Sequence, residues 1–216
     1  VAVAVLGALS LPVAAPAQDA AQPAPLDQPY AGMLAVNVDL TDAPRRVFRM
    51  HETIPVKPGP FTLFYPEWIP GEHAPSGPIE NIAGLIISAN GKPLAWRRDL
   101  RDMFSLHLEV PAGVSQLDLA YQFLAPGDGE GSLFGASASS TPNLVDLEFN
   151  QVAFYPAGYY TRQIRIQPSV ELPPGWKFGS ALQVDRQSGN TVHFKPVTFN
   201  NFVDSPLIAG RYFNRV

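Results

Sequence analysis

The 216-residue chain contains no cysteine. Disulfide bonds and thiolate metal sites are therefore excluded, and stability has to come from the packing of a core. Charged residues are also scarce, at 16% of the chain, and the net charge is −4. An acidic chain of this kind does not favour nucleic acid or an anionic membrane surface as a partner, and neither is expected.

The chain lacks an apolar run long enough to span a bilayer. Residues 1–17, which carry no charged side chain, resemble a secretory signal peptide, because Ala15-Pro16-Ala17 fits a small-x-small cleavage site. There is no initiating Met and no basic segment before it, so we interpret it as a signal-peptide remnant. This interpretation predicts a periplasmic or secreted protein, and an Ala-rich disordered tail is the alternative.

Helical periodicity is also missing, while proline is abundant, with 23 residues. After a Pro/Ala-rich tether at residues 18–29, apolar residues recur with a period of two, which is typical of strands. The Asn90-Gly91 pair predicts a hairpin. We expect strands within residues 33–40, 47–54, 61–65, 85–96, 104–110, 116–124, 146–155, 162–172, 191–197 and 207–213.

This pattern predicts an all-β fold, an antiparallel β-sandwich of about ten strands over residues 30–216. Long loops and only short helical turns, near residues 157–160 and 199–204, are expected within it. Residues 125–144 are rich in Gly and Ser and predict a long loop. Ser137 and Ser139 lie in this loop without the final Gly of a nucleophile elbow, so a flexible linker is the favoured interpretation.

The histidines and the charged turn at residues 97–102 do not form a recognisable catalytic or metal-binding motif. His51-Glu52 begins like a zinc-protease motif, but position 55 is Pro where a second His would be needed, and the stretch is a predicted strand. The chain has only four histidines, with no short ligand spacing, so no metal site or catalytic residue is predicted. A site assembled from distant His and carboxylate side chains remains an alternative. Residues 97–102 alternate in charge and predict a solvated turn with weak surface pairs, or an interdomain contact.

Aromatic residues offer a further possibility. Trp68, Trp96 and Trp176, with three tyrosines in residues 155–160, could form a sugar-stacking platform. Aromatic side chains in a sandwich more often pack in the core or at an edge, and this is the favoured interpretation.

The stretch YPEWIPGEHAPSGPIENIAG, residues 65–84, is too rich in Pro and Gly for a regular helix. Glu72 and His73 are adjacent, but neighbours on an extended loop point in different directions and make no acid/base pair. We predict a stiff loop that Trp68 anchors to the sandwich and that presents an edge to a neighbour. Glu72 and His73 are predicted to be exposed, with no metal between them.

Two motifs together resemble a known family. YPEWIPGEH at residues 65–73, followed by GPIEN at 77–81, resembles the W-x-P-G loop in the N-terminal domain of the glycyl aminopeptidase family, which are PDZ-bearing zinc metallopeptidases. FVDSPLIAG at residues 202–210 resembles the LVDSP-x-x-AG segment of that family, and the hairpin leading to Trp96 lies between the two in the same order.

The resemblance implies a non-catalytic β-domain that packs on a thermolysin-like catalytic domain and helps to shape its cleft. It implies that zinc, peptide substrate and a PDZ domain belong with parts absent from this chain, which itself needs no cofactor and alone is expected to be inactive. The expected contact surface lies in the loop after Trp68 and where the chain would pass into the next domain. Its candidate residues are Trp68, Pro70, Gly71, Glu72, His73, Asn81 and Asp204.

A free-standing exported binding module, for example for carbohydrate, is the alternative function. Tryptophan side chains that are coplanar and exposed on one face would favour it, and burial of these rings would count against it. An enzyme complete in itself is a third and weaker possibility.

Overall fold

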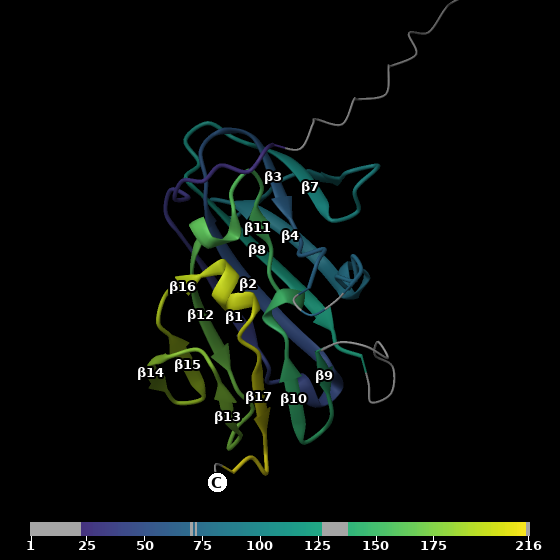
Figure 1. Cartoon of the computed structure of the whole chain (residues 1–216), viewed down its shortest axis with the longest axis vertical. Coiled ribbons are helices and arrows are strands. Elements are labelled where there is room, and N and C mark those ends of the chain that lie inside the picture. Colours follow the sequence, from purple (N-terminus) through teal and green to yellow (C-terminus); the bar gives the residue numbers. More distant parts are fainter. Residues whose placement is uncertain (1–22, 70, 72, 127–137, 215–216) are drawn as a thin grey trace, which may run out of the picture.

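The computed structural model describes residues 23–69, 71, 73–126 and 138–214 (Figure 1). The predicted signal-peptide remnant and the first part of the tether lie outside these residues. The regular secondary structure of the described part of the chain consists mainly of strands, with only short helical segments, which confirms the all-β prediction.

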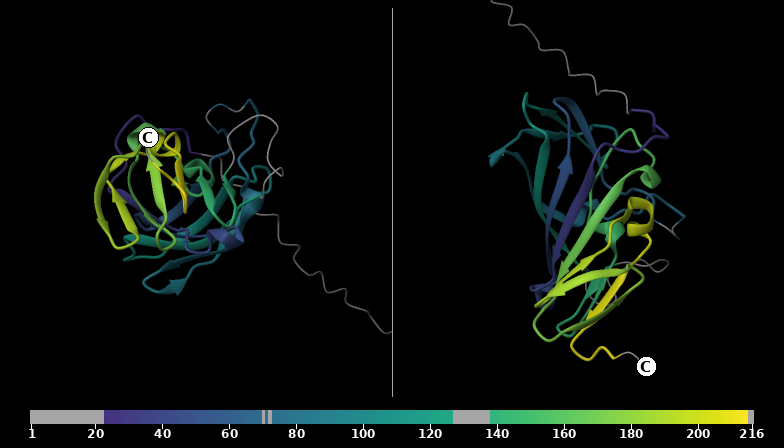
Figure 2. Two further views of the ribbon diagram at one scale, coloured as in Figure 1. Left: turned by 90° about the horizontal axis from the view of Figure 1, so that it is seen from below. Right: turned by 90° about the vertical axis from the view of Figure 1, so that its left-hand side faces the viewer.

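One large sheet forms the frame of the molecule. In the described part of the chain it has nine strands, in the order β14-β15-β12-β1-β2-β8-β4-β5, with β16 paired to β12 (Figures 1 and 2). Its strands are β1 (Met33–Asp39), β2 (Val47–Pro55), β4 (Ile82–Ala89), β5 (Lys92–Pro93), β8 (Gln116–Leu124), β12 (Arg165–Glu171), β14 (Val184–Ser188), β15 (Thr191–Phe194) and β16 (Val197–Thr198).

Two smaller sheets complete the fold, each with four strands among the described residues. The first has the order β13-β17-β10-β9 and the second the order β11-β3-β7-β6. Their strands are β3 (Gly59–Phe64), β6 (Trp96–Arg98), β7 (Ser105–Val110), β9 (Ser139–Ser140), β10 (Leu144–Leu147), β11 (Tyr155–Pro156), β13 (Lys177–Ser180) and β17 (Leu207–Gly210).

Helical structure in the described residues is limited to short turns. The five-residue helix α1 (Phe199–Val203) lies where a helical turn was expected. The turn expected near residues 157–160 does not form there; a 3-10 turn follows at Thr161–Gln163. The other 3-10 turns are Ala43–Arg45, Ile79–Asn81 and Phe149–Gln151.

The sheets depart from the sequence prediction in three places. β1 and β12 run parallel, whereas a purely antiparallel sandwich was predicted, because a period of two fixes the face of a strand but not the direction of its partner. Residues 146–155 do not form one strand, since the 3-10 turn at Phe149–Gln151 interrupts them. In β7 both faces are covered, so Ser105 and His107 are buried although alternation predicted them on an open face.

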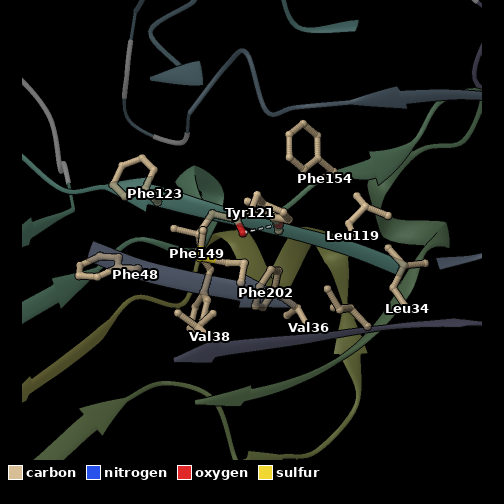
Figure 3. Close-up of a cluster of buried hydrophobic side chains, with 14 of the residues drawn as sticks. Leu34, Val36, Val38, Phe48, Leu119, Tyr121, Phe123, Phe149, Phe154 and Phe202 are labelled. Atoms are coloured by element: carbon tan, nitrogen blue, oxygen red, sulfur yellow. Dashed lines mark hydrogen bonds between the residues drawn. The ribbon is translucent and has the colours of Figure 1, made fainter. Parts of the chain in front are cut away.

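A single hydrophobic core lies between the sheets (Figure 3). Aromatic rings dominate it. Phe149 and Phe202 lie 4.5 Å apart between ring centroids, and Tyr121 and Phe154 meet edge to face at 5.1 Å. Burying each such side chain contributes about 1.5–3 kcal/mol, so a fold without disulfides can rest on this core.

The described end of the predicted tether lies against the domain. Leu26 forms an isolated parallel bridge with Tyr159. Asp27 accepts a hydrogen bond from the Gln163 amide at 2.7 Å and pairs with Arg162 at 2.8 Å. Residues 26–30 therefore run alongside the 3-10 turn at Thr161–Gln163.

Candidate functional site

The loop that begins at Tyr65 is fixed to the core at its start. Tyr65 is buried, and its hydroxyl donates a hydrogen bond to the Gln151 carbonyl at 2.6 Å. Its backbone N–H donates to Phe104 at 2.9 Å, and its ring contacts Phe154 edge to face. A buried hydroxyl bonded to a backbone carbonyl holds both chain segments in one arrangement.

A glycine fixes the second arm of the same loop, where the chain comes back past its starting point. The Gly77 N–H donates to the Glu67 carbonyl at 3.0 Å. A Cβ atom at Gly77 would lie 1.9 Å from the Pro66 carbonyl oxygen, so no other residue fits without moving the backbone. Ile79, two residues on, is buried in the core. The loop is therefore held at both ends.

Trp68 lies in this loop but does not anchor it. Its side chain is 62% exposed, whereas that of Ile69 is 5% exposed. The prediction that Trp68 anchors the loop is wrong, because Ile69 takes the inward side of the extended chain and turns its neighbour outward.

Next to Trp68 the surface is hollowed by a groove of about 390 Å³. Residues 66–69 form one wall. Asn150, Tyr155 and the α1 residues Phe199 and Val203 form much of the remainder. We call this the Trp68 groove. The structure thus brings together two regions that the sequence singled out separately, the W-x-P-G loop and the segment just before Asp204.

Helix α1 is held in place by its N-cap, by two buried rings and by a hydrogen bond from Asn150. The Thr198 hydroxyl accepts a hydrogen bond from the Asn201 N–H at 3.3 Å, as an N-cap residue does. Phe199 and Phe202 are buried, so the helix presses one face into the core. Asn150 donates from its side-chain amide to the Val203 carbonyl at 3.1 Å, which ties the end of α1 to the 3-10 turn at Phe149–Gln151.

The Trp68 groove has an acidic and aromatic character. Burial, and then the charge of Asp102, raise the pKa of the Glu67 carboxyl. Burial raises the pKa of Tyr155 to about 12, and the charges of Glu67 and Asp102 add to this. Tyr155 therefore stays a neutral hydroxyl at physiological pH.

Carboxylates gather beside the groove, around the end of β10. Asp146 is half-buried and Glu148 is 5% exposed, while Asp204 caps the end of α1 and is exposed. Burial raises the pKa of Glu148, and Asp146 and Asp204 raise it further, although a hydrogen bond from Asn150 acts in the opposite direction. We call Asp146, Glu148 and Asp204 the acidic cluster. The sequence analysis named only Asp204 among them.

The remaining predicted site residues lie away from the groove walls or outside the described residues. His73 is exposed, as predicted, and Gly71 has a φ of +85°, which suits glycine. Asn81 is half-buried at the end of the 3-10 turn Ile79–Asn81. Pro70 and Glu72 lie outside the described residues.

Glu52, named above only as part of a failed zinc-protease motif, is a buried titratable group. It is fully buried on β2, where its Oε2 atom accepts from the Phe154 N–H at 3.1 Å and lies 2.9 Å from the Tyr121 hydroxyl. Its Oε1 atom has no hydrogen-bond partner. Burial raises the pKa of Glu52 to about 8. The period of two could have revealed it, since Glu52 continues the inward row of Phe48, Met50 and Ile54.

The turn at residues 97–102 is largely exposed, as predicted, and Asp99 is the exception. Asp99 is 8% exposed and pairs with the equally buried His107 at 2.8 Å. The other ring nitrogen of His107 lies 2.9 Å from the Thr62 hydroxyl. Hydrogen bonds from the Arg101 N–H, His107 and the Asp102 N–H lower the pKa of Asp99 to about 2. The carboxylate is satisfied by its own turn, which makes it a structural group.

The three tryptophans do not form a common platform. Trp176 is buried, Trp96 is half-buried and Trp68 is exposed. Burial of Trp176 counts against the stacking surface that a carbohydrate-binding module would use.

No metal site is apparent in the part of the chain that the structure describes. Its His, Asp and Glu side chains form no group of three or more that could hold a metal ion. The described residues therefore do not fit the zinc ion of a metallopeptidase, and no chemical step is derived through one. None of the described helices is long and apolar enough to cross a membrane.

Comparison with solved structures finds a similar fold in peptidases. An aminopeptidase N family protein from Idiomarina loihiensis matches with a TM-score of 0.68 and 18% identity, over 82% of this chain and 29% of that one. An M1 zinc metallopeptidase from Deinococcus radiodurans matches with a TM-score of 0.49 and 13% identity, over 88% and 43% of the two chains. This chain thus spans under a third of the Idiomarina protein. The first likeness supports the fold, and the second is too weak to support an argument.

Comparison with curated proteins finds no match. Comparison with family models gives a match over residues 35–211, to the peptidase M61 N-terminal domain. The matched range includes both motifs that carried the resemblance, the W-x-P-G loop and the VDSP segment. It also covers all of the described walls of the Trp68 groove. The chain belongs to the peptidase M61 N-terminal domain family.

Proposed function

We propose that this domain packs against the zinc-binding catalytic domain of an aminopeptidase, within one polypeptide, and that the Trp68 groove forms an edge of the substrate cleft. The observation that carries the proposal is Trp68 itself. A tryptophan ring that is 62% exposed, beside a groove and on a fixed loop, is the kind of group that anchors an interface.

The supports of the loop strengthen the proposal. The buried side chains of Tyr65 and Ile79 hold the two ends of the loop in the core. The hydrogen bond from the Gly77 N–H to the Glu67 carbonyl joins its two arms. A surface that is already ordered loses little conformational entropy when a partner binds. The Trp68 loop is therefore suited to docking rather than to closing over a ligand.

In the proposed intact enzyme, zinc and its ligands belong to the catalytic domain, which hydrolyses peptide bonds near a free N-terminus with a metal-activated water. Family membership supports this role. A PDZ domain and a periplasmic or secreted location are further parts of the proposal. The location is supported by the uncharged stretch at residues 1–17 and the Ala15-Pro16-Ala17 pattern.

The first test is docking. The gene is sequenced beyond the codon for Val216. The polypeptide encoded there is produced separately, and its binding to residues 1–216 is measured by titration calorimetry. We expect an H-E-x-x-H motif downstream and a complex that Trp68→Ala weakens at least tenfold, on the order expected for a central aromatic anchor. Tyr212→Ala is the matched control, because Tyr212 is an exposed aromatic residue outside the groove.

The second test is activity. The combined chains should cleave a Gly- or Ala-aminoacyl reporter and lose activity on chelation, and Trp68→Ala should lower kcat/KM. A stop codon after Val216 with no H-E-x-x-H downstream would rule the proposal out. So would chelator-sensitive cleavage by purified residues 1–216 alone.

A further inference from the structure

The acidic cluster lies where two paired strands meet the Trp68 groove. β10 and β17 pair with Leu147 opposite Leu207. Glu148 directly follows β10, and Asp204 shortly precedes β17, so both lie at the same end of the pair. The three carboxylates are close enough for Asp146 and Asp204 to raise the pKa of Glu148.

No cation of the described chain balances this cluster. The ion pairs of the described residues involve other carboxylates, and no Lys, Arg or His among those residues contributes to the pKa of Asp146 or Glu148. Both groups are held in partly desolvated positions next to like charge. A carboxylate in such a place is normally paired, because an unpaired buried charge is costly.

A second observation comes from Asn150. Its side chain is 3% exposed and bonds to both Glu148 and the Val203 carbonyl, yet its Oδ1 atom has no partner. These bonds orient the amide between the acidic cluster and the Trp68 groove. The buried acceptor could take a hydrogen bond from a donor, and the carboxylates beside it favour a donor that carries positive charge.

The chemistry of the cluster selects an organic cation. A metal ion does not fit, because the three carboxylates do not converge closely enough to hold one ion; the described residues contain no such group of three or more His, Asp or Glu. A guanidinium offers five N–H donors in a planar array that matches several carboxylate and amide oxygens at once. It is also less strongly hydrated than an ammonium, so it enters a partly buried site at lower cost.

We propose that Asp146, Glu148 and Asp204, with the Asn150 amide oxygen, form a receptor for one arginine side chain of the domain that packs against the Trp68 groove. The identity of the partner rests on the proposed function, whereas the receptor for a guanidinium group does not. Residues 127–137 contain no Lys or Arg, and Arg215 is the single basic residue outside the described part of the chain.

The receptor is tested on residues 1–216 alone. Methylguanidinium chloride is titrated at constant ionic strength while the Asn150 side-chain amide signals are followed by NMR. We expect a saturable shift that Glu148→Gln abolishes and that Glu109→Gln, an exposed carboxylate on β7, leaves unchanged. The absence of a saturable shift, or an equal response to methylammonium, overturns the proposal. Binding that appears only in Arg215→Ala also overturns it, because the chain's own Arg215 would then fill the site.

The arginine donor is tested with the downstream domain. Glu148→Gln should weaken docking at least tenfold, and Glu109→Gln should leave it unchanged. Failure of the wild-type chains to associate would reject the proposed function, and the methylguanidinium titration would still decide the receptor. Association that is equally strong with Glu148→Gln would reject the arginine contact and leave the proposed function standing.

Discussion

Replacing Glu52 with glutamine should flatten the pH dependence of stability of this domain. Glu52 is fully buried between the sheets, and burial raises its pKa from 4.5 to about 8. The Tyr121 hydroxyl lies 2.9 Å from both the Glu52 carboxyl and the Val152 carbonyl, but it has one proton to donate. A protonated Glu52 can donate to Tyr121 and leave that proton for Val152, so the neutral form suits this network.

The direction of the effect follows from the raised pKa. The folded chain holds the Glu52 proton more tightly than the unfolded chain does, so this contribution to stability is complete below about pH 4.5 and is lost as the pH rises to about 8. In that window the free energy of unfolding falls by about 1.4 kcal/mol per pH unit. Between pH 5 and pH 7.5 the loss amounts to about 3 kcal/mol.

The Glu52→Gln variant keeps the shape of the side chain and an acceptor for the Phe154 N–H, but it does not titrate. Its amide donors would lie where Oε1 has no partner, which costs about 1–3 kcal/mol at every pH. The variant should therefore be less stable than the wild type at pH 5. The difference should shrink as the pH rises, and the variant should be as stable or more stable near pH 8.

Urea unfolding at pH 5, 6, 7 and 8, followed by tryptophan fluorescence, measures both curves. Contributions from groups that are common to both proteins cancel in the difference. The free energy of unfolding of the Glu109→Gln variant, changed at an exposed position, should depend on pH in the same way as that of the wild type. If Glu52→Gln also runs parallel to the wild type, Glu52 titrates normally and the reasoning from burial is wrong.

Three further changes probe the supports of the Trp68 groove and the turn at Asp99. Gly77→Ala should lower the free energy of unfolding by about 2–4 kcal/mol in urea titrations, because its Cβ would meet the Pro66 carbonyl. Thr198→Ala should cost about 0.5–2 kcal/mol in the same assay, through loss of the α1 cap. Asp99→Asn should flatten the stability curve between about pH 4 and pH 2, measured by acid titration of the fluorescence. The lowered pKa of Asp99 means that its contribution is present above pH 4 and is lost as the pH falls.

Much of the strand pattern could be predicted from the sequence, because each long strand has one buried face. β8 begins and ends where alternation placed it, at Gln116 and Leu124. The direction of pairing could not be predicted, since β1 and β12 carry similar patterns and nothing in a period of two distinguishes a parallel partner from an antiparallel one.

The groove could be predicted only in part. The W-x-P-G motif drew attention to Trp68, and the VDSP motif to Asp204, but the sequence did not show that they approach one another. That proximity depends on Asn150, which bonds to Val203 from a turn that interrupts a predicted strand. The exposure of Trp68 was missed for a similar reason, because aromatic character alone does not decide which of Trp68 and Ile69 turns inward.

The buried acidic groups of this domain differ in what satisfies them. Glu52 lies in the core beyond the reach of a partner, and a single proton neutralises it. Asp99 has two donors in its own turn and a third, His107, on β7. The acidic cluster has neither remedy in full, since one proton removes only one of its charges and Asn150 supplies its only described hydrogen bond to Glu148. A cation supplied by a partner is the remaining way to balance the acidic cluster. The cluster lies beside the groove that the exposed Trp68 lines. Unsatisfied charge and exposed apolar surface therefore indicate the same docking face, on independent physical grounds.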